Sequence, residues 1–311
     1  MKQKIITLVL LIVSISAYAG PTYQDIPGIS AQDNQRIKQT LEKYENYKDR
    51  KVATFDADGT IIGQVPYYLA DVAIFDYALN HTGKKLDLIK NMTSGSNTSN
   101  DYLTQRVDYL SWLTPQEITD LGNKTFNKYF KGKIYPNIKL LIQNLKNYGF
   151  EVWIISASPE LLYQGVLSRE FGIPVNHIIG TKSVVSNGVT TNKIVLPVPQ
   201  DDGKADAIET IIKAEPILAA GNSISDVEML NYSSTLKVIV NPNDSEKVDY
   251  LGGKTLKEYA ESQNWIIAKA NDTVDVANYK NMASYKFHIK QNEVNDVQTF
   301  SLNWYFLFHK K

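Results

Sequence analysis

Short apolar runs alternate with segments of helical spacing along most of the chain. Continuous apolar stretches rich in β-branched residues occur at 51–55, 150–155, 217–220 and 237–240, and each has the length of a buried strand. Between them, apolar residues recur three and four positions apart, as in helices that pack on a sheet. Strands without polar alternation have both faces covered. The pattern therefore predicts an α/β fold with a parallel sheet flanked by helices.

Capping and turn residues locate several elements. Ser30 to Asp33 resembles a capping box, and Thr114 to Glu117 supplies an N-cap, a proline at the first helical position and a first-turn acid. A helix opens at Tyr135-Pro136 and ends at Gly149, and a hairpin turns at Asn187-Gly188. Two further helices are expected where Ser158-Pro159-Glu160 begins a helix and where a helix follows Lys204.

A long helical segment separates the first strand from the second. Apolar positions such as Leu69, Ala73 and Phe75 keep helical spacing, and a polar stretch from Thr93 to Asp101 reads as a loop between helices. We therefore expect a helical insertion at residues 63–132, within a core made of residues 20–62 and 133–311.

The first nineteen residues have a pattern of their own. Lys2 and Lys4 precede an apolar run from Ile5 to Ile15, and Ala17-Tyr18-Ala19 gives a small-x-small ending. This run is shorter than the roughly 20 residues that span a bilayer. We expect residues 1–19 to be a secretory signal peptide, cleaved after Ala19, and the protein to be periplasmic or secreted in a bacterium. The alternative is an uncleaved anchor helix; after cleavage no stable membrane anchor is expected.

Composition narrows the classes of partner. The 311 residues are 43% hydrophobic, enough to bury a core, and 33 basic residues balance 33 acidic ones. Nothing builds the positive face that nucleic acid requires. The chain has no cysteine, which excludes disulfides, a thiolate nucleophile and thiolate metal sites.

The stretch Phe55-Asp56-Ala57-Asp58-Gly59-Thr60 places two carboxylates where the first strand ends. Carboxylates are costly to bury there without a cation or a proton, and the glycine lets the backbone turn back towards what they hold. A solvated turn is the alternative. A calcium loop would need Asp or Asn at position 60, Gly at 61 and Glu at 67, and the chain has Thr, Ile and Tyr there. The motif indicates a divalent metal and a nucleophile.

Further polar residues follow the other strands. Ser156 ends the second strand, Asn222 and Asp226 follow a later one, and Lys204 lies near the start of the preceding helix. Open parallel sheets bind ligands at the carboxyl ends of their strands, so these groups are expected to converge. Such a set suits phosphoryl transfer, which depends on positioning and on neutralising developing charge.

Taken in their order along the chain, these polar residues resemble the four motifs of the haloacid dehalogenase (HAD) superfamily of aspartate-nucleophile phosphohydrolases. The resemblance covers roughly residues 50–270. The resemblance implies a Rossmann-like core. The helical insertion is similar to the small helical C1 cap of the phosphoserine-phosphatase-like branch. The motifs are Asp56-Ala57-Asp58-Gly59-Thr60, Ser156, Lys204 and Gly221-Asn222-Ser223-Ile224-Ser225-Asp226.

The resemblance also implies a role for each residue. Asp56 would attack phosphorus and form an aspartyl-phosphate, and Asp58 would protonate the leaving alkoxide and then deprotonate water. Ser156 would hydrogen-bond a phosphoryl oxygen, and Lys204 would stabilise the charge of the intermediate. Structural alternatives are a helix cap for Ser156, although Ser158 is better placed for one, and a solvated face for Lys204.

A bound Mg²⁺ is implied as cofactor, held by Asp56, the backbone carbonyl of Asp58, and Asn222 or Asp226 of the last motif. The family usually has Asp where this chain has Asn222. An amide oxygen adds no charge, so we expect weaker magnesium binding with activity retained. Asp226 as the direct ligand, or a loss of turnover, are alternative consequences.

Together these observations favour a magnesium-dependent phosphomonoester hydrolase that acts on a small phosphorylated metabolite. A phosphotransferase and a non-catalytic phosphate-binding protein on the same fold are the alternatives. Aromatic residues of the insertion, Tyr67 and Tyr68 among them, are candidates for caging a quaternary ammonium such as that of phosphocholine, or else simply pack between helices. Arg106 is a candidate for clamping a substrate carboxylate or a second phosphate, or else is a solvated side chain. Gln64 disfavours phosphoserine, because phosphoserine-specific relatives tend to have an acid shortly after the first motif.

Overall fold

The computed structural model describes residues 20–81, 85–94 and 99–272 of the chain. The predicted signal peptide, residues 1–19, lies outside the described residues, as does the aromatic-rich segment 273–311.

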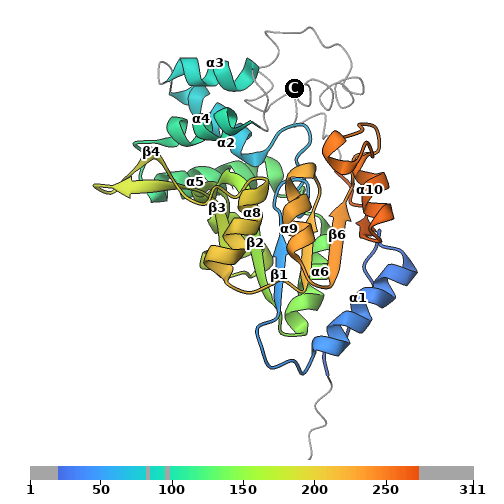
Figure 1. Ribbon diagram of the computed structural model, residues 1–311. Coiled ribbons are helices and arrows are strands. Elements are labelled where there is room, and N and C mark those ends of the chain that lie inside the picture. The colour runs from blue at the N-terminus through green and yellow to red at the C-terminus, as the bar shows by residue number, and fades with distance from the viewer. Residues whose placement is uncertain (1–19, 82–84, 95–98, 273–311) are drawn as a thin grey trace, which may run out of the picture.

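Within the described residues, the strands form one seven-stranded sheet in the order β4-β3-β2-β1-β5-β6-β7 (Figure 1). Neighbouring strands are parallel except for β3 and β4, which form a hairpin around Asn187-Gly188. This confirms the predicted parallel-dominated α/β sheet and its hairpin. The strands are β1 (Val52–Phe55), β2 (Glu151–Pro159), β3 (Ile178–Ser186), β4 (Val189–Val195), β5 (Leu218–Gly221), β6 (Leu236–Val240) and β7 (Ile266–Ala268).

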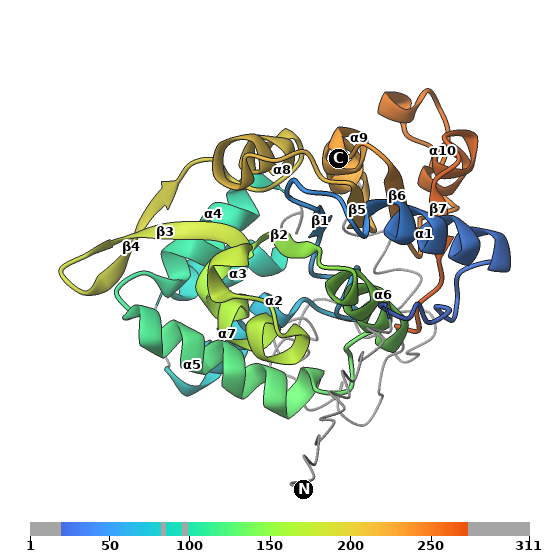
Figure 2. The same cartoon turned by 90° about the horizontal axis from the view of Figure 1, so that it is seen from below.

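Alternate side chains of the strands enter two cores, one on each face of the sheet. Phe55 of β1 packs in one core with the apolar faces of α1 (Ala31–Tyr44), α6 (Pro136–Asn147) and α7 (Glu160–Phe171). Val52 of the same strand packs in the other core, with α8 (Asp202–Ala207), α9 (Val227–Tyr232) and α10 (Leu256–Ser262). Figure 2 shows these two layers of helices on either side of the strands.

No helix in the described ranges is long and apolar enough to cross a membrane.

Short helical turns complete these layers. The π-helical turns η1 (Phe126–Phe130) and η3 (Ile208–Ile212) continue the preceding helices, and the 3-10 turns are η2 (Val175–His177), η4 (Ile224–Asp226) and η5 (Asp249–Leu251).

The described helices of the expected helical insertion lie beyond the carboxyl ends of the central strands (Figure 1). These helices are α2 (Leu69–Asn80), α3 (Leu86–Ser94), α4 (Asn100–Leu110) and α5 (Pro115–Thr125). Helix α5 packs directly on α7 of the core, because Gly122 lets the two backbones meet. A Cβ atom on Gly122 would lie 2.0 Å from the carbonyl oxygen of Leu162.

Two predicted helix starts, those of α1 and α5, are confirmed by the hydrogen bonds of their N-cap side chains. The Ser30 hydroxyl accepts from the backbone N–H of Asp33 at the start of α1, and Thr114 and Glu117 form a reciprocal capping box on α5. The loop predicted from Thr93 is wrong at its edges, because α3 extends to Ser94 and α4 starts at Asn100.

The N-cap of α7 and the start of α8 differ from the sequence prediction. Strand β2 runs on through Pro159, which is the N-cap residue of α7, so Ser158 does not cap that helix. Helix α8 begins at Asp202, ahead of Lys204, and therefore carries the lysine in its first turn.

Candidate active site

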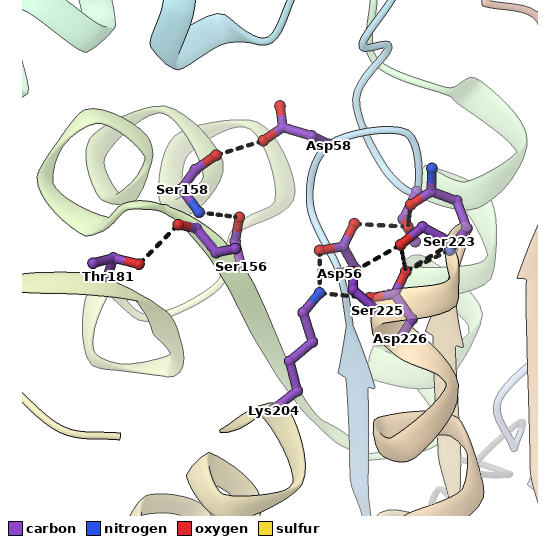
Figure 3. Close-up of polar contacts among 12 residues, drawn as sticks. Asp56, Asp58, Ser156, Ser158, Thr181, Lys204, Ser223, Ser225 and Asp226 are labelled. Carbon is purple, nitrogen blue, oxygen red and sulfur yellow. Dashed lines mark hydrogen bonds and ion pairs between the residues drawn. The ribbon is translucent and has the colours of Figure 1, made fainter. Parts of the chain in front are cut away.

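The carboxyl ends of β1 and β5 bring together the acid and the lysine predicted from the first and third motifs. Asp56 follows β1, and its backbone N–H donates to the carbonyl of Ala220 in β5 (2.9 Å). Its Oδ1 lies 2.6 Å from the Nζ of Lys204, which extends from α8 (Figure 3). The lysine side chain is only 2% exposed, so its charge is directed at the carboxylates around it.

Lys204 is shared between two carboxylates. Its Nζ also donates to Oδ1 of Asp226 at 2.5 Å. Burial alone would lower the pKa of Lys204, but the Asp226 and Asp56 carboxylates outweigh burial and raise it. Burial raises the pKa of Asp56, and the positive charge of Lys204 opposes that rise. The lysine thus stays protonated and compensates carboxylates that burial would otherwise neutralise.

Asp226 is fully engaged by the loop that follows β5. Its Oδ2 accepts from the backbone N–H groups of Asn222 and Ser223, both at 2.9 Å, and from the Ser223 hydroxyl at 3.0 Å. Its Oδ1 is held by Lys204. The carboxylate therefore shapes the loop and orients the lysine.

The Asn222 side chain faces the first motif. The Thr60 hydroxyl lies 3.0 Å from Oδ2 of Asp56 and 3.2 Å from Oδ1 of Asn222, so these two oxygens converge on one point. Gly59 makes room for this approach, since a Cβ atom there would lie 2.1 Å from Nδ2 of Asn222. The glycine has φ +80°, which a residue with a side chain rarely adopts.

Asp58 points away from the lysine and towards helix α7 (Figure 3). Its Oδ2 accepts from the Ser158 hydroxyl at 2.8 Å, and the Tyr163 hydroxyl lies 2.8 Å from both carboxylate oxygens. Burial raises the pKa of Asp58, although these two hydrogen bonds and the Arg106 charge work against the rise. A carboxyl group with a raised pKa, set apart from the first acid, has the properties of a general acid.

Ser156 lies on β2, two residues before Ser158, and is 4% exposed. Its Oγ accepts from the backbone N–H of Ser158 at 3.2 Å, which fixes the turn that presents the Ser158 hydroxyl to Asp58.

The substrate candidates of the helical insertion lie on helix α4 and at the start of α2. Arg106 of α4 is 4% exposed, and its charge acts on Asp58 and on Asp71 of α2. Its guanidinium stacks over the ring of Tyr102 at 4.9 Å. Tyr67 is buried and Tyr68 is half-buried at the start of α2. The alternative of a solvated Arg106 is wrong, because the side chain is buried against Asp71 and Tyr102.

The predicted ligands form an oxygen-only set suited to Mg²⁺. Among the described residues, no group of three or more His, Asp or Glu side chains is arranged to hold a metal ion. The implied set instead combines a carboxylate, an amide oxygen and the Asp58 backbone carbonyl. The convergence of Asp56 and Asn222 on the Thr60 hydroxyl fits such a set, since Mg²⁺ is bound through one or two carboxylates with water and phosphate completing the shell.

Some contributors to the site were missed from the sequence. Thr60, Ser158 and Tyr163 contact the two aspartates, yet hydroxyl residues are too common to stand out individually. Asp71 could have been identified from the sequence, because a charged residue within the apolar stretch Leu69–Phe75 needs a buried partner. Asp272 gave no such signal, since it reaches Gln64 and Val65, just after the first motif, from the far end of the described chain.

Comparison with known proteins gives the family of this chain. Residues 53–231 match the family model described as haloacid dehalogenase-like hydrolase. A phosphoserine phosphatase of Mycobacterium tuberculosis is 26% identical over 157 residues, which are 48% of this chain and 50% of that protein. The chain thus spans about half the length of the curated relatives it matches.

Solved structures share the fold at lower identity. A protein of unknown function from Bordetella pertussis Tohama I superposes with a TM-score of 0.56 at 18% identity, covering 71% of this chain and 99% of that one. A functionally unknown protein from Anaerococcus prevotii gives a TM-score of 0.61 at 13% identity, covering 81% of this chain and 97% of the other. At these identities, the similarities show a shared fold and nothing about function.

Proposed function

Because this chain belongs to the haloacid dehalogenase-like hydrolases, we propose that it hydrolyses phosphomonoesters, with Asp56 as the nucleophile. The observation that carries the proposal is the pairing of Asp56 with Lys204 at 2.6 Å, while Asp58 is held separately by Ser158 and Tyr163. Two buried acids in different surroundings can take different roles in one reaction. The phosphoserine phosphatase relative supports this reaction class.

In the first step, a carboxylate oxygen of Asp56 forms a bond to phosphorus as the bond to the leaving alkoxide breaks. Asp58 gives its proton to that alkoxide, and the aspartyl-phosphate remains on Asp56. Lys204 stabilises the charge that accumulates on the phosphoryl group, and Ser156 lies beside the reacting edge to hydrogen-bond a phosphoryl oxygen.

In the second step, Asp58 takes a proton from water. The resulting oxygen attacks phosphorus, and the bond between phosphorus and Asp56 breaks to release inorganic phosphate. Ser158 and Tyr163 keep Asp58 oriented through both transfers.

We propose Asp56, the Asp58 backbone carbonyl and Asn222 as the residues that would hold Mg²⁺. When bound, the ion would neutralise charge on the phosphoryl oxygens. Asn222 is preferred to Asp226 as the direct ligand, because both oxygens of Asp226 already accept hydrogen bonds from Lys204 and the loop.

The substrate is a small phosphorylated metabolite whose leaving group lies under the helical insertion, next to Arg106. Because Asp71 offsets the Arg106 charge, we expect a leaving group with polar, largely uncharged substituents to be preferred over one with a free carboxylate. A phosphocholine-like substrate is the weaker alternative, since Tyr67, one of the aromatic candidates, is only 1% exposed.

The test is hydrolysis of an aryl phosphate by residues 20–311, measured with magnesium and with a chelator, beside Asp56→Asn. We expect metal-dependent turnover that falls by about a thousandfold or more in the variant. Asp244→Ala serves as the control, because Asp244 forms an exposed ion pair with Lys257 (2.7 Å) away from the motifs. Phosphate binding by folded protein, without turnover of several phosphoesters, would instead establish the non-catalytic alternative.

We also propose that the protein is exported, on the basis of the signal-like pattern of residues 1–19. N-terminal sequencing of the protein from its native compartment tests this, with Gly20 expected as the first residue.

A further inference from the structure

The carboxylate of Asp272 reaches the start of the helical insertion from beyond the last strand of the sheet. Its Oδ2 accepts from the backbone N–H groups of Gln64 (2.8 Å) and Val65 (3.1 Å). Its Oδ1 forms an ion pair with Nζ of Lys133 at 2.8 Å. One side chain therefore contacts both connections between the core and the insertion, the outgoing residues 63–65 and the returning Lys133.

The two connections are also joined to each other. The backbone N–H of Gly63 donates to the carbonyl of Lys133 at 2.7 Å, and Ile62 pairs with Ile134 in an antiparallel bridge. The Lys133 ammonium donates to the carbonyl of Val65 as well. Lys133 thus bridges Val65, through a hydrogen bond, and Asp272, through an ion pair.

Packing around this cluster is close. The Asp272 side chain is 9% exposed and that of Lys133 is 13% exposed, so solvent screens their attraction little. A Cβ atom on Gly63 would lie 2.3 Å from Oδ1 of Asp272. A glycine at this position is what allows the carboxylate to approach the backbone.

We propose that Asp272 is a positioning residue that fixes the helical insertion over the candidate active site by tying its two connections together. The proposal rests on the proposed function for its kinetic consequence, but not for its structural one. Asp272 lies beyond residue 231, where the match to the family model ends.

The contact acts on the reaction through Asp58. The outgoing connection continues directly from the loop that carries Asp58, and the Gly59 N–H donates to the carbonyl of Ile62 (2.7 Å). Loosening residues 63–65 lets the insertion tilt and admits water around Asp58 and Arg106. Small displacements of a catalytic acid carry large rate penalties.

The first experiment measures the distance between the insertion and the core with spin labels. The chain has no native cysteine, so only the introduced cysteines are labelled. Spin labels on Asp101→Cys in α4 and Glu209→Cys in the core, both exposed positions, report the distance between insertion and core. We expect one narrow distance distribution in the labelled parent chain and in Asp244→Ala. Asp272→Ala should broaden the distribution or add a longer distance, and Lys133→Met should do the same from the other side of the ion pair.

The kinetic arm measures aryl phosphate hydrolysis by the same variants. We expect Asp272→Ala to lower kcat about tenfold or more with a smaller change in KM. Asp272→Asn should recover part of the loss, because its amide oxygen can still accept from Gln64 and Val65. Parent-like distances and kcat in folded Asp272→Ala would overturn the proposal. An inactive parent whose distances still respond to Asp272→Ala would overturn only the proposed function.

Discussion

The guanidinium of Arg106 lies 3.7 Å from the carboxylate of Asp71, and neither side chain is more than 5% exposed. Nη1 and Nε of Arg106 and Oδ1 of Asp71 make no hydrogen bond to any residue that the structure describes. The contact is therefore a buried ion pair without aligned hydrogen bonds, which joins α4 to α2 within the helical insertion. In such a pair, desolvation competes closely with Coulomb attraction.

Removing one partner should cost far more than removing both. We expect Arg106→Met to lower the free energy of unfolding by about 3–5 kcal/mol, since it leaves the Asp71 charge buried and uncompensated. The double variant Arg106→Met/Asp71→Leu should regain most of that loss. Urea unfolding of the single and double variants measures the coupling, and additive losses would show that the pair does not interact.

Stability should also depend on pH through Asp71. Burial raises the pKa of Asp71 to about 6, against the opposing charge of Arg106. The folded state thus holds a proton that the unfolded chain has already released, so this contribution is present below pH ~4 and is lost as the pH rises through about 6. From the roughly two-unit difference in pKa, we expect a loss of up to about 3 kcal/mol relative to Asp71→Asn. Unfolding of both proteins at pH 5 and pH 7 checks the sign, and parallel changes would refute it.

Asn222→Asp should strengthen magnesium binding. A carboxylate adds a negative charge where the amide oxygen now faces the Thr60 hydroxyl, so we expect the magnesium concentration for half-maximal activity to fall about tenfold. Calorimetric titration with Mg²⁺ gives a readout independent of turnover. Asn231→Asp, at an exposed position of α9, controls for the added charge. An unchanged affinity would remove Asn222 from the ligand set.

The close contact between α5 and α7 should depend on Gly122 having no side chain. Although alanine favours helices over glycine, Gly122→Ala would force a Cβ atom to within 2.0 Å of the Leu162 carbonyl oxygen. We expect a loss of about 1–3 kcal/mol in unfolding free energy. Gly132→Ala is the matched control, because nothing lies within 4 Å of the Cβ atom it would add. Equal stability of the two variants would contradict the close helix contact.

The sequence predicted those parts of the fold that local chemistry determines. The apolar runs at β1, β2, β5 and β6 and the Asn187-Gly188 turn are strong signals because burial and backbone geometry leave few alternatives. Strand β7 and helix α10 were not predicted, and β7 has only three residues. Helix α7 starts at Glu160, within the predicted Ser158-Pro159-Glu160, but its N-cap is Pro159 and not Ser158, because β2 extends past Ser156 to Pro159.

The candidate site was predictable as far as strand ends could place charged residues at one edge. Asp56, Lys204 and Asp226 meet as expected. The partners of Asp58 were not predictable, because Ser158 and Tyr163 become neighbours only through the path of β2 into α7. Whether an aspartate contacts a lysine or a hydroxyl is decided by side-chain direction, which residue spacing does not encode.

Strand order has a consequence for how the protein assembles. Lys204 and Asp56 are 148 positions apart, and β1, the first strand along the chain, occupies the middle of the sheet between β2 and β5. The ion pair at the centre of the site can form only after much of the chain has packed around β1. Contacts between residues so far apart in the sequence slow folding. During refolding from denaturant, helical signal should therefore return before catalytic turnover does, and the recovery of turnover would time the docking of β1.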